Sequence, residues 1–339
     1  MNKISVGVIG CGYFGPNYIR IAHELINCNM NYCADIKNDK LKKTKKLYPA
    51  IKTTLDYNNI LNDSLVDAVI IATNPSTHYK IVKDALNKKK HVLVEKPLTL
   101  SSKECLKLKK LAQKNKKILM VAHTYDYNSA LRSVKALLRK KNLGELIYVN
   151  FLRKGLGPIR GDINAMWDLM PHDISIMLRL IEEKPVSVSA TGVSHIKKSK
   201  PDVVFLTFKF KKNFIVTMQA SWLDPYKTRN ISFVGDKKML IFEDTSVNEK
   251  IKIINKGIGY QKQFVNFGEF QSMVSAGDVT IPQIEMKEPL KEQVKHFFEC
   301  ISKNKKPLSG PDEAIAVVKV LEFAQESLDK KGKEINIKF

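Results

Sequence analysis

The stretch Ile4–Arg20, ISVGVIGCGYFGPNYIR, decides the fold of this chain. It opens with six strand-forming residues, continues with G-x-G-x-x-G from Gly10 to Gly15, and ends in an apolar pattern of helical period. In a strand–turn–helix unit the first glycine allows a tight turn, the second lets backbone approach a pyrophosphate, and the third lets helix pack on strand. The N–H groups at the helix start would bind the phosphates. The stretch therefore predicts a dinucleotide-binding βαβ unit.

An acidic residue at a suitable distance supports this interpretation over a structural glycine turn in another α/β protein. Asp35 lies twenty residues after Gly15, at the end of the apolar strand 30–34. Its carboxylate would accept hydrogen bonds from a ribose diol and repel a 2′-phosphate, which favours NAD over NADP, although Lys37 lies nearby. We expect the cofactor to be bound by Gly10, Cys11, Gly12, Tyr13, Phe14, Gly15 and Asp35.

Length and composition narrow the classes of protein to consider. A chain of 339 residues, 44% hydrophobic and 27% charged, suits two ordinary globular domains. We find neither a signal-peptide pattern nor an apolar run near the ~20 residues that span a bilayer, so we expect a cytoplasmic protein that contacts no membrane. Five cysteines without a C-x-x-C pair argue against a disulfide framework and a zinc site, and we expect no metal.

The net charge of +23 suggests an anionic partner. Fifty of the 57 basic residues are lysines, spread over predicted helix surfaces without interleaved aromatics. No recognised nucleic-acid motif accompanies them, so a solvated, lysine-rich surface is the favoured interpretation and no nucleic acid is expected. An acidic substrate such as a nucleotide-linked sugar would still be attracted by this field.

Residues 1–122 alternate short apolar strands with amphipathic helices, which is typical of a doubly wound parallel sheet, the Rossmann fold. The turn Thr73–His78 follows the buried strand 67–72, and Glu95-Lys96-Pro97 follows the strand 91–94. Ligands of such sheets bind beyond the carboxyl ends of the strands. We therefore expect a second group of residues near the cofactor: Thr73, Asn74, His78, Glu95 and Lys96. The helix after the first of these turns is expected over 78–87.

Residues 123–339 predict an α+β domain with a large, open, mainly antiparallel sheet. Between residues 243 and 285 no element can be assigned. The expected helices are 128–141, 165–182, 288–302 and 311–328, and the expected strands are 146–153, 186–191, 203–210, 214–221, 230–235 and 238–242.

Polar residues recur every four positions on the helix expected over 165–182. Asn164, Asp168 and His172 would share one face, with Trp167 beside them. Burying an Asp–His pair is costly unless the pair is satisfied or functional. Either Asp168 simply hydrogen-bonds His172 as a structural pair, or the two serve catalysis; Asp173, one residue further round the helix, is expected to be structural.

Together, GVIGCGYFG, the Thr73–His78 turn, Glu95-Lys96-Pro97 and the D-x-x-x-H of Asp168 and His172 resemble the Gfo/Idh/MocA oxidoreductase family in order and spacing. The resemblance covers essentially the whole chain. It implies a Rossmann domain, 1–122, followed by an α/β domain, 123–339, whose open sheet often forms homodimer or homotetramer contacts. It also matches Lys96, Asp168 and His172 to the catalytic lysine, aspartate and histidine of the family.

The segment GPIRGDINAMWDLMPHDIS, residues 157–175, looks most like family members that act on nucleotide-linked sugars. The leading hypothesis is therefore NAD-dependent oxidation of a UDP-sugar hydroxyl, at C3 of UDP-N-acetylglucosamine or a relative, in envelope polysaccharide or lipid A biosynthesis, with an aminotransferase downstream. The alternatives are an inositol or free-sugar dehydrogenase and a non-catalytic NAD-sensing regulator. Whether Lys96 or His172 is the base stays open. The expected substrate contacts are Tyr125, Arg153, Arg160, Asn164, Trp167 and His172, with the arginines at the diphosphate.

Overall fold

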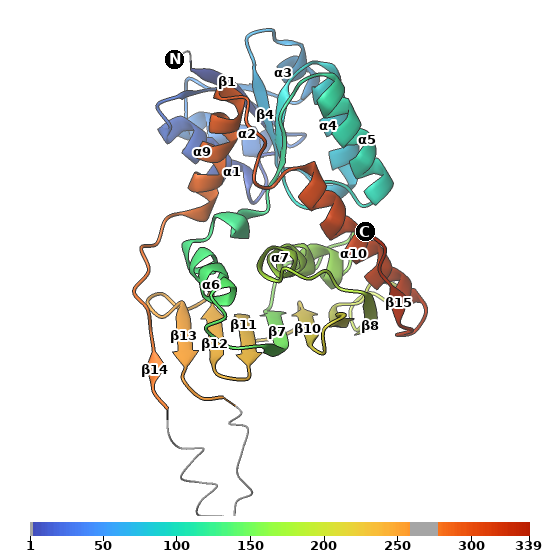
Figure 1. Ribbon diagram of the computed structural model, residues 1–339. Coiled ribbons are helices and arrows are strands. Elements are labelled where there is room, and N and C mark those ends of the chain that lie inside the picture. The colour runs from blue at the N-terminus through green and yellow to red at the C-terminus, as the bar shows by residue number, and fades with distance from the viewer. Residues whose placement is uncertain (1–2, 258–276) are drawn as a thin grey trace, which may run out of the picture. The chain divides into compact units, whose positions relative to one another are not determined.

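The computed structural model describes residues 3–257 and 277–339 (Figure 1). The chain forms two compact units, one of Met1–Tyr127 with Lys287–Lys319 and one of Asn128–Met286 with Val320–Phe339. The sequence placed everything after residue 122 in the second domain, whereas Lys287–Lys319 belongs to the first unit. Residues 258–276, in the section where no element was assigned, lie outside the described residues.

The first unit contains a six-stranded parallel sheet in the order β3-β2-β1-β4-β5-β6. The chain reverses its winding direction between β1 and β4, which is the usual dinucleotide-binding topology, so the predicted Rossmann fold is confirmed. The strands are β1 (Ile4–Ile9), β2 (Cys28–Ala34), β3 (Lys52–Thr54), β4 (Ala68–Ile71), β5 (His91–Val94) and β6 (Leu119–Val121). The helices are α1 (Gly15–Glu24), α2 (Asn38–Leu47), α3 (Asn58–Asn62), α4 (Pro75–Asn87), α5 (Ser102–Lys114) and the 3₁₀ helix η1 (Thr124–Tyr127).

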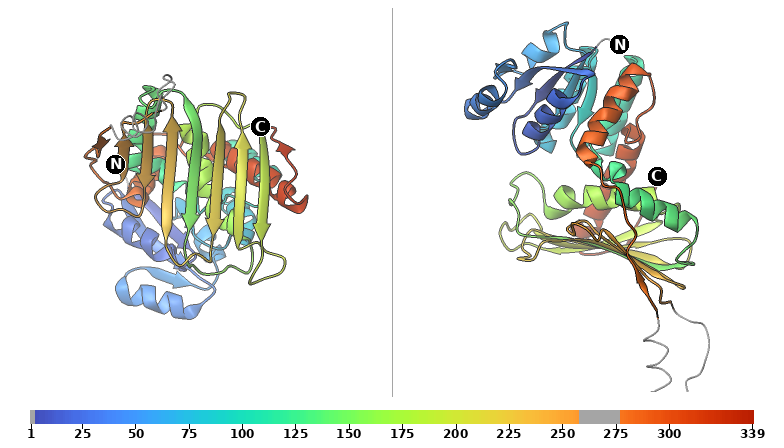
Figure 2. Two further views of the ribbon diagram at one scale, coloured as in Figure 1. Left: turned by 90° about the horizontal axis from the view of Figure 1, so that it is seen from below. Right: turned by 90° about the vertical axis from the view of Figure 1, so that its left-hand side faces the viewer.

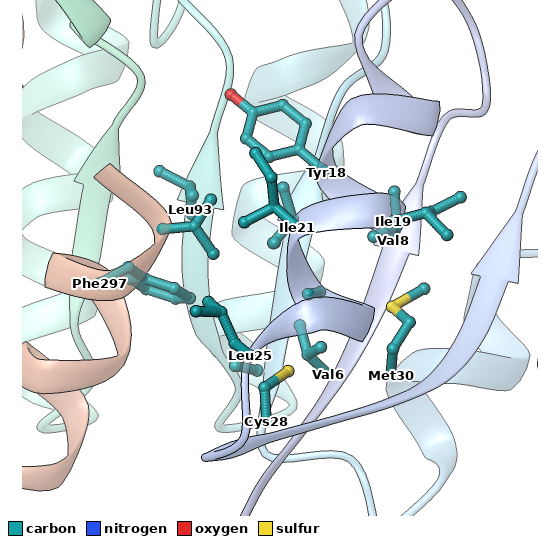
Figure 3. Close-up of a cluster of buried hydrophobic side chains, with 14 of the residues drawn as sticks. Val6, Val8, Tyr18, Ile19, Ile21, Leu25, Cys28, Met30, Leu93 and Phe297 are labelled. Atoms are coloured by element: carbon teal, nitrogen blue, oxygen red, sulfur yellow. The ribbon is translucent and has the colours of Figure 1, made fainter. Parts of the chain in front are cut away.

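Helix α9 (Pro289–Ser302) joins the first unit through its apolar face. Val294, Phe297 and Phe298 are fully buried in the same cluster as the side chains of β1, α1 and β5. Figure 3 shows Phe297 in this cluster with Leu25 and Leu93. A late segment of the chain therefore completes the core of the first unit.

The second unit contains a nine-stranded sheet in the order β14-β13-β12-β11-β7-β10-β9-β8-β15. Only the pairing of β7 with β10 is parallel among the described strand pairs of this sheet, so the prediction of a mainly antiparallel sheet is confirmed. The strands are β7 (Leu146–Lys154), β8 (Ser187–Val193), β9 (Val203–Lys209), β10 (Ile215–Ser221), β11 (Thr228–Gly235), β12 (Met239–Glu243), β13 (Ile251–Ile254), β14 (Val279–Thr280) and β15 (Ile335–Asn336).

Helices of the second unit cover one face of this sheet. Figure 2 shows α6 (Ser129–Arg139) and α7 (Ala165–Leu180) on that face, and no helix of the described chain on the other. The side chains of β7 follow the same division, because Val149, Phe151 and Arg153 are buried whereas Tyr148 is exposed. The last helix, α10 (Pro311–Asp329), runs through residues of both units. None of the described helices is both long and apolar enough to cross a membrane.

Candidate functional site

The glycine-rich loop at the end of β1 has the backbone that a dinucleotide site needs. Gly10 adopts a φ of +97°, and a Cβ there would lie 2.6 Å from the carbonyl oxygen of Ala72. A Cβ on Gly15 would lie 2.0 Å from the carbonyl oxygen of Gly10, so only glycine lets α1 start against the loop. Above Gly12 the space is open apart from the Lys40 ammonium, 3.7 Å from a Cβ position. A pyrophosphate could approach the backbone here, as the sequence predicts.

Asp35 fixes this loop from the end of β2. One of its carboxylate oxygens accepts the N–H of Cys11 at 2.7 Å, and the other accepts the N–H of Lys37 at 2.8 Å. The side chain of Phe14, the residue that precedes α1, forms no capping hydrogen bond with the helix. It therefore leaves the N–H groups of the first turn to a phosphate. The side chain of Tyr13 is exposed beside it. These residues fit a bound NAD: the loop and helix start for its phosphates, the carboxylate for its ribose.

The turns after β4 and β5 are joined by a buried histidine. The ring of His78 places Nδ1 2.8 Å from the carbonyl oxygen of Pro97 and Nε2 3.1 Å from that of Thr73. Thr73 also shares a hydroxyl–hydroxyl hydrogen bond of 2.8 Å with Thr77. The helix that was expected from residue 78 begins at Pro75, directly after Asn74, because proline suits the first helical position. His78 is therefore a structural link between the two turns.

Glu95 and Lys96 follow β5 in different environments. Glu95 is buried and accepts a 2.7 Å hydrogen bond from the Tyr18 hydroxyl. Burial raises the pKa of Glu95, although this hydrogen bond and the Lys96 charge act in the opposite direction. Burial, followed by the Glu95 charge, also raises the pKa of Tyr18 well above its ordinary value. Glu95 thus has a structural partner on α1, while Lys96 remains half-buried. Tyr125 is half-buried in η1 of the same unit.

In the second unit, Asn164 caps the N-terminus of α7. Its side-chain oxygen accepts the N–H of Trp167 at 3.0 Å. Its amide nitrogen donates to Gln325, which also accepts the Trp167 indole N–H at 3.1 Å. Asn164 directly precedes α7, which begins at Ala165 as expected, and its carbonyl oxygen accepts the N–H of Asp168 at 3.1 Å. That its side chain shares a face with Asp168 and His172 stays a prediction. Substrate contact by Asn164 and Trp167 stays a prediction, and their observed partner is Gln325.

Asp168 and His172 lie one turn apart on α7, as the spacing predicts. One oxygen of Asp168 accepts the Trp222 indole N–H at 3.1 Å, and the other lies 3.5 Å from the Arg160 guanidinium. Trp222 is a residue that the sequence did not indicate, although a tryptophan directly after β10 was an available signal. Asp168 is only partly exposed, at 17% of its side chain. A predicted Asp168–His172 hydrogen bond stays a prediction.

Arg160 leads into α7 with two carboxylate partners. Its guanidinium forms a fork with Asp162, with both N–O distances at 3.0 Å, and reaches Asp168 as well. Burial alone would lower the pKa of Arg160, but the hydrogen bonds and charges of both aspartates raise it. Arg160 is therefore a fixed cation at the beginning of the helix that carries Asp168.

Arg153 has a structural partner in place of the predicted phosphate. Its guanidinium donates to Asp173 at 2.6 to 2.9 Å, with side chains only 6% and 4% exposed. The alternation of β7 turns Arg153 inward toward α7. This geometry supports the expected structural role of Asp173 and does not support a diphosphate role for Arg153. Among the described residues, no group of three or more His, Cys, Asp or Glu side chains is arranged to hold a metal ion.

Comparison with known proteins matches both units. The description "Oxidoreductase family, NAD-binding Rossmann fold" fits residues 4–123, and "GFO/IDH/MocA C-terminal domain" fits residues 131–241. The UDP-N-acetylglucosamine 3-dehydrogenase of Acidithiobacillus ferrooxidans is 31% identical over 230 residues, which are 65% of this chain and 68% of that protein. The 2,7-anhydro-N-acetylneuraminate hydratase of Escherichia coli (strain K12) is 25% identical over 233 residues, 64% of this chain but only 61% of that protein.

A solved structure is similar over almost the whole chain. The UDP-N-acetylglucosamine 3-dehydrogenase of Acidithiobacillus ferrooxidans superposes with a TM-score of 0.82, covering 98% of this chain and 99% of that one. At 20% sequence identity this likeness shows the fold alone. With a Rossmann unit of dinucleotide-binding geometry and family matches over both units, the chain belongs to the Gfo/Idh/MocA family of oxidoreductases.

Proposed function

We propose that this protein is an NAD-dependent dehydrogenase that oxidises a hydroxyl of a nucleotide-linked sugar to a ketone, at C3 of UDP-N-acetylglucosamine or a related UDP-sugar. The observation that carries the proposal is the pair Asp168 and His172, one turn apart on α7, with Asp168 held by Trp222 and Arg160. An acid–base pair oriented in this way suits proton transfer at a substrate hydroxyl. The similarity to a UDP-N-acetylglucosamine 3-dehydrogenase supports the substrate class.

Oxidation of a secondary alcohol removes a hydride from the carbon and a proton from the oxygen. NAD, when bound, supplies the hydride acceptor. His172 would take the hydroxyl proton, because an imidazole ordinarily exchanges protons near neutral pH. Asp168 would orient the imidazole or the substrate hydroxyl. Lys96, directly after β5, would hydrogen-bond the reacting oxygen and stabilise its developing negative charge.

A desolvated lysine can itself act as a base, so the roles of Lys96 and His172 need a direct comparison. If His172 is the base, Lys96→Met lowers kcat but leaves the acid limb of the pH profile in place. If Lys96 is the base, that limb moves or disappears in Lys96→Met and survives in His172→Ala. Stopped assays from pH 5 to pH 10 distinguish the two.

The test of function is incubation of the purified protein with NAD⁺ and a panel of UDP-sugars, followed by absorbance and mass spectrometry. We expect reduced nicotinamide to accumulate while one sugar loses two mass units. Lys96→Met and His172→Ala should lower kcat by roughly 10²–10⁴-fold, the usual contribution of a positioned acid–base group. The exposed Lys103→Met and His195→Ala serve as matched controls and should keep wild-type rates.

Other outcomes would replace the proposal. Turnover of inositols or free hexoses, with none of UDP-sugars, would identify a dehydrogenase of free polyols. A product changed by the mass of one water, without net reduction of NAD⁺, would indicate the chemistry named for the hydratase relative. Tight NAD binding without any turnover would indicate a regulator.

The proposed product also fits a biosynthetic setting. A keto group on a UDP-amino sugar is the kind of carbonyl that a transaminase converts to an amine. We therefore place the enzyme in the cytoplasm, ahead of an aminotransferase in envelope polysaccharide or lipid A assembly. A coupled assay with a transaminase and an amino donor should turn the ketone into a second amine on the sugar, and an unconsumed ketone would argue against this place.

We further propose that the protein forms a homodimer or homotetramer through the helix-free face of the nine-stranded sheet. Tyr148 of β7 and Ile215 of β10 are paired in register and are 42% and 43% exposed, and Phe205 of β9 is 48% exposed. Exposed aromatic and aliphatic groups gathered on one face favour association. Light scattering of the wild type and of Ile215→Lys would test it: we expect a smaller species for the variant, and a wild-type monomer would contradict the assembly.

A further inference from the structure

The turn between β8 and β9 brings lysines to the loop that leads into α7. Residues 194–202 contain Lys197, Lys198 and Lys200. The ammonium of Lys200 donates to the carbonyl oxygen of Gly161. The ammonium of Lys197 lies 3.3 Å from the position that a Cβ on Gly161 would take. Two like charges therefore meet at one glycine.

Neither ammonium is neutralised by a carboxylate in residues 3–257 and 277–339. The nearby carboxylates have other partners: Asp162 pairs with Arg160, and Asp202 accepts the N–H groups of His195 and Ile196 at 2.8 and 2.9 Å. Lys197 and Lys200 repel one another unless an anion lies between them. Arg160, one residue before Gly161, carries a third positive charge, which Asp162 and Asp168 already pair. The arrangement is thus suited to an anionic ligand.

Hydrogen bonds fix this turn to the part of α7 that carries Asp168. The carbonyl oxygen of Pro201 accepts the N–H of Ala165, the first residue of α7, at 3.0 Å. The carbonyl oxygen of Asp202 accepts the N–H of Trp222 at 3.0 Å, and the Trp222 indole donates to Asp168. A ligand phosphate at Lys197 and Lys200 would therefore be held at a set position relative to Asp168.

We propose that Lys197 and Lys200 bind the diphosphate of the substrate. This inference rests on the proposed function and assigns the diphosphate to residues other than Arg153. Lysines bind phosphates as point charges. A neutral polyol offers nothing to such a cluster, so the site selects a nucleoside-diphosphate sugar.

The test is calorimetric titration of the full-length protein with UDP and, separately, with uridine. Each charge-assisted hydrogen bond to a phosphate typically changes affinity by roughly tenfold or more. We expect Lys197→Gln and Lys200→Gln each to weaken UDP binding about tenfold, and the double variant about a hundredfold, with uridine binding unchanged. Lys198→Gln, an exposed change in the same turn, is the matched control and should stay within about twofold.

Kinetics and salt give independent readouts. The KM for the UDP-sugar should rise with the Kd for UDP while kcat stays within about threefold, because the diphosphate lies away from the reacting carbon. Rising salt should weaken UDP binding by the wild type more than by the double variant. Lys200→Arg keeps the charge and should retain most of the affinity. Lys200 also contacts the backbone of Gly161, so Lys200→Gln could disturb the fold. If this variant impairs uridine or NADH binding as well, UDP binding by the exposed Lys197→Gln alone tests the diphosphate site.

The outcomes separate this inference from the proposed function. Equal UDP affinity of the double variant and Lys198→Gln overturns the diphosphate site, and the function stands if the wild type oxidises UDP-sugars. Loss of UDP binding in the double variant, with no UDP-sugar oxidised by the wild type, supports the site and rejects the reaction. A wild type that neither binds UDP nor oxidises a UDP-sugar overturns both.

Discussion

In the phosphate loop, the absence of a side chain at three glycines determines how the backbone folds and what can approach it. Gly10 and Gly15 lie so close to backbone oxygens that a methyl group on either would clash with the fold itself. Gly12 differs, because the space that its side chain would fill is open. The first two are therefore needed for folding of the loop, whereas the third is needed for what binds to it.

This difference makes the glycines separable by mutation. Gly15→Ala should lower the free energy of unfolding by about 1–3 kcal/mol, as overpacking does, and weaken NADH binding. Gly12→Ala should unfold like the wild type yet bind NADH at least tenfold more weakly, since the methyl group blocks the pyrophosphate. Thermal unfolding and NADH fluorescence measure both. Gly157→Ala, with nothing within 4 Å, is the control; full NADH affinity in Gly12→Ala would contradict the assigned cofactor position.

The Arg153–Asp173 pair is buried. Removal of one partner therefore leaves the other buried without its ion pair, which costs folding free energy. Arg153→Met should destabilise the protein by about 3–5 kcal/mol, because the buried side chain of Asp173 would lose its guanidinium partner. The double variant Arg153→Met/Asp173→Leu should recover much of that loss in urea unfolding. UDP affinity at a temperature where the variants stay folded should not change. A selective loss of UDP binding would instead return Arg153 to the diphosphate.

These residues also show how far the sequence predicts a site. The spacing of Asp168 and His172 was sufficient to place them one turn apart on α7. It could not identify Trp222 as the partner of Asp168, because the two are distant in the chain and meet only through the packing of β10 on α7. Nor could it distinguish a phosphate-binding arginine from one whose strand position turns it inward, as for Arg153.

At the scale of elements, β5 is joined to β6 partly through a histidine that must be neutral. The Nδ1 of His91 accepts the N–H of Ile118 at 3.0 Å, and its Nε2 lies 3.4 Å from the Lys117 ammonium. Burial, followed by the Lys117 charge, lowers the pKa of His91 from 6.5 to about 4. Protonation would remove the acceptor and add a like charge.

The sign of the pH effect follows from this lowered pKa. Between about pH 6.5 and pH 4 the unfolded chain binds the proton and the folded chain does not. The free energy of unfolding therefore decreases as the pH falls through this window, and the contribution of His91 is fully present above it. The loss should be on the order of 1–3 kcal/mol, reduced by the partial exposure of the ring. Urea midpoints from pH 4 to pH 7 should show a shallower slope for His91→Asn than for the wild type. The exposed His195→Asn should keep the wild-type slope; equal slopes in all three proteins would contradict the assignment.

Most elements were predictable within a few residues, because their apolar periods of two or 3.6 extend over several residues. The short strands β13, β14 and β15, of four, two and two residues, were not predicted. An alternation of apolar and polar residues cannot be recognised over so few positions. Strands of this length form because they pair with a neighbouring strand. The sequence predicts the start of α4 three residues too late, at His78, whereas the helix begins at Pro75.

At the scale of the whole molecule, the unexpected feature is that α9 belongs to the cofactor-binding unit. Its amphipathic pattern predicted a helix with one buried face. Such a pattern does not say which core receives that face, and the position of α9 after the second unit in the chain suggested the wrong one. Burial of Val294, Phe297 and Phe298 determines the assignment.

A core contribution from α9 should link this distant helix to cofactor binding. Phe297→Ala should cost about 3–5 kcal/mol of unfolding free energy, the usual effect of emptying a buried aromatic position. In differential scanning calorimetry, Phe297→Ala should lower the midpoint temperature of the same unfolding transition that added NADH raises in the wild type. Glu299→Ala, on the exposed side of the same helix, should change stability by less than about 0.5 kcal/mol. An NADH-sensitive transition that ignores Phe297→Ala would contradict the shared core.

The placement of α9 also sets an order of events during synthesis. The strands of the Rossmann sheet leave the ribosome first, but the helix that closes their core follows only after the whole intervening segment Asn128–Met286. At translation rates of roughly 5–20 residues per second, that interval is on the order of ten seconds or more. We therefore expect residues 1–127 of the nascent chain to expose, for that time, the apolar surface that α9 later covers, and to bind chaperones at the ribosome exit.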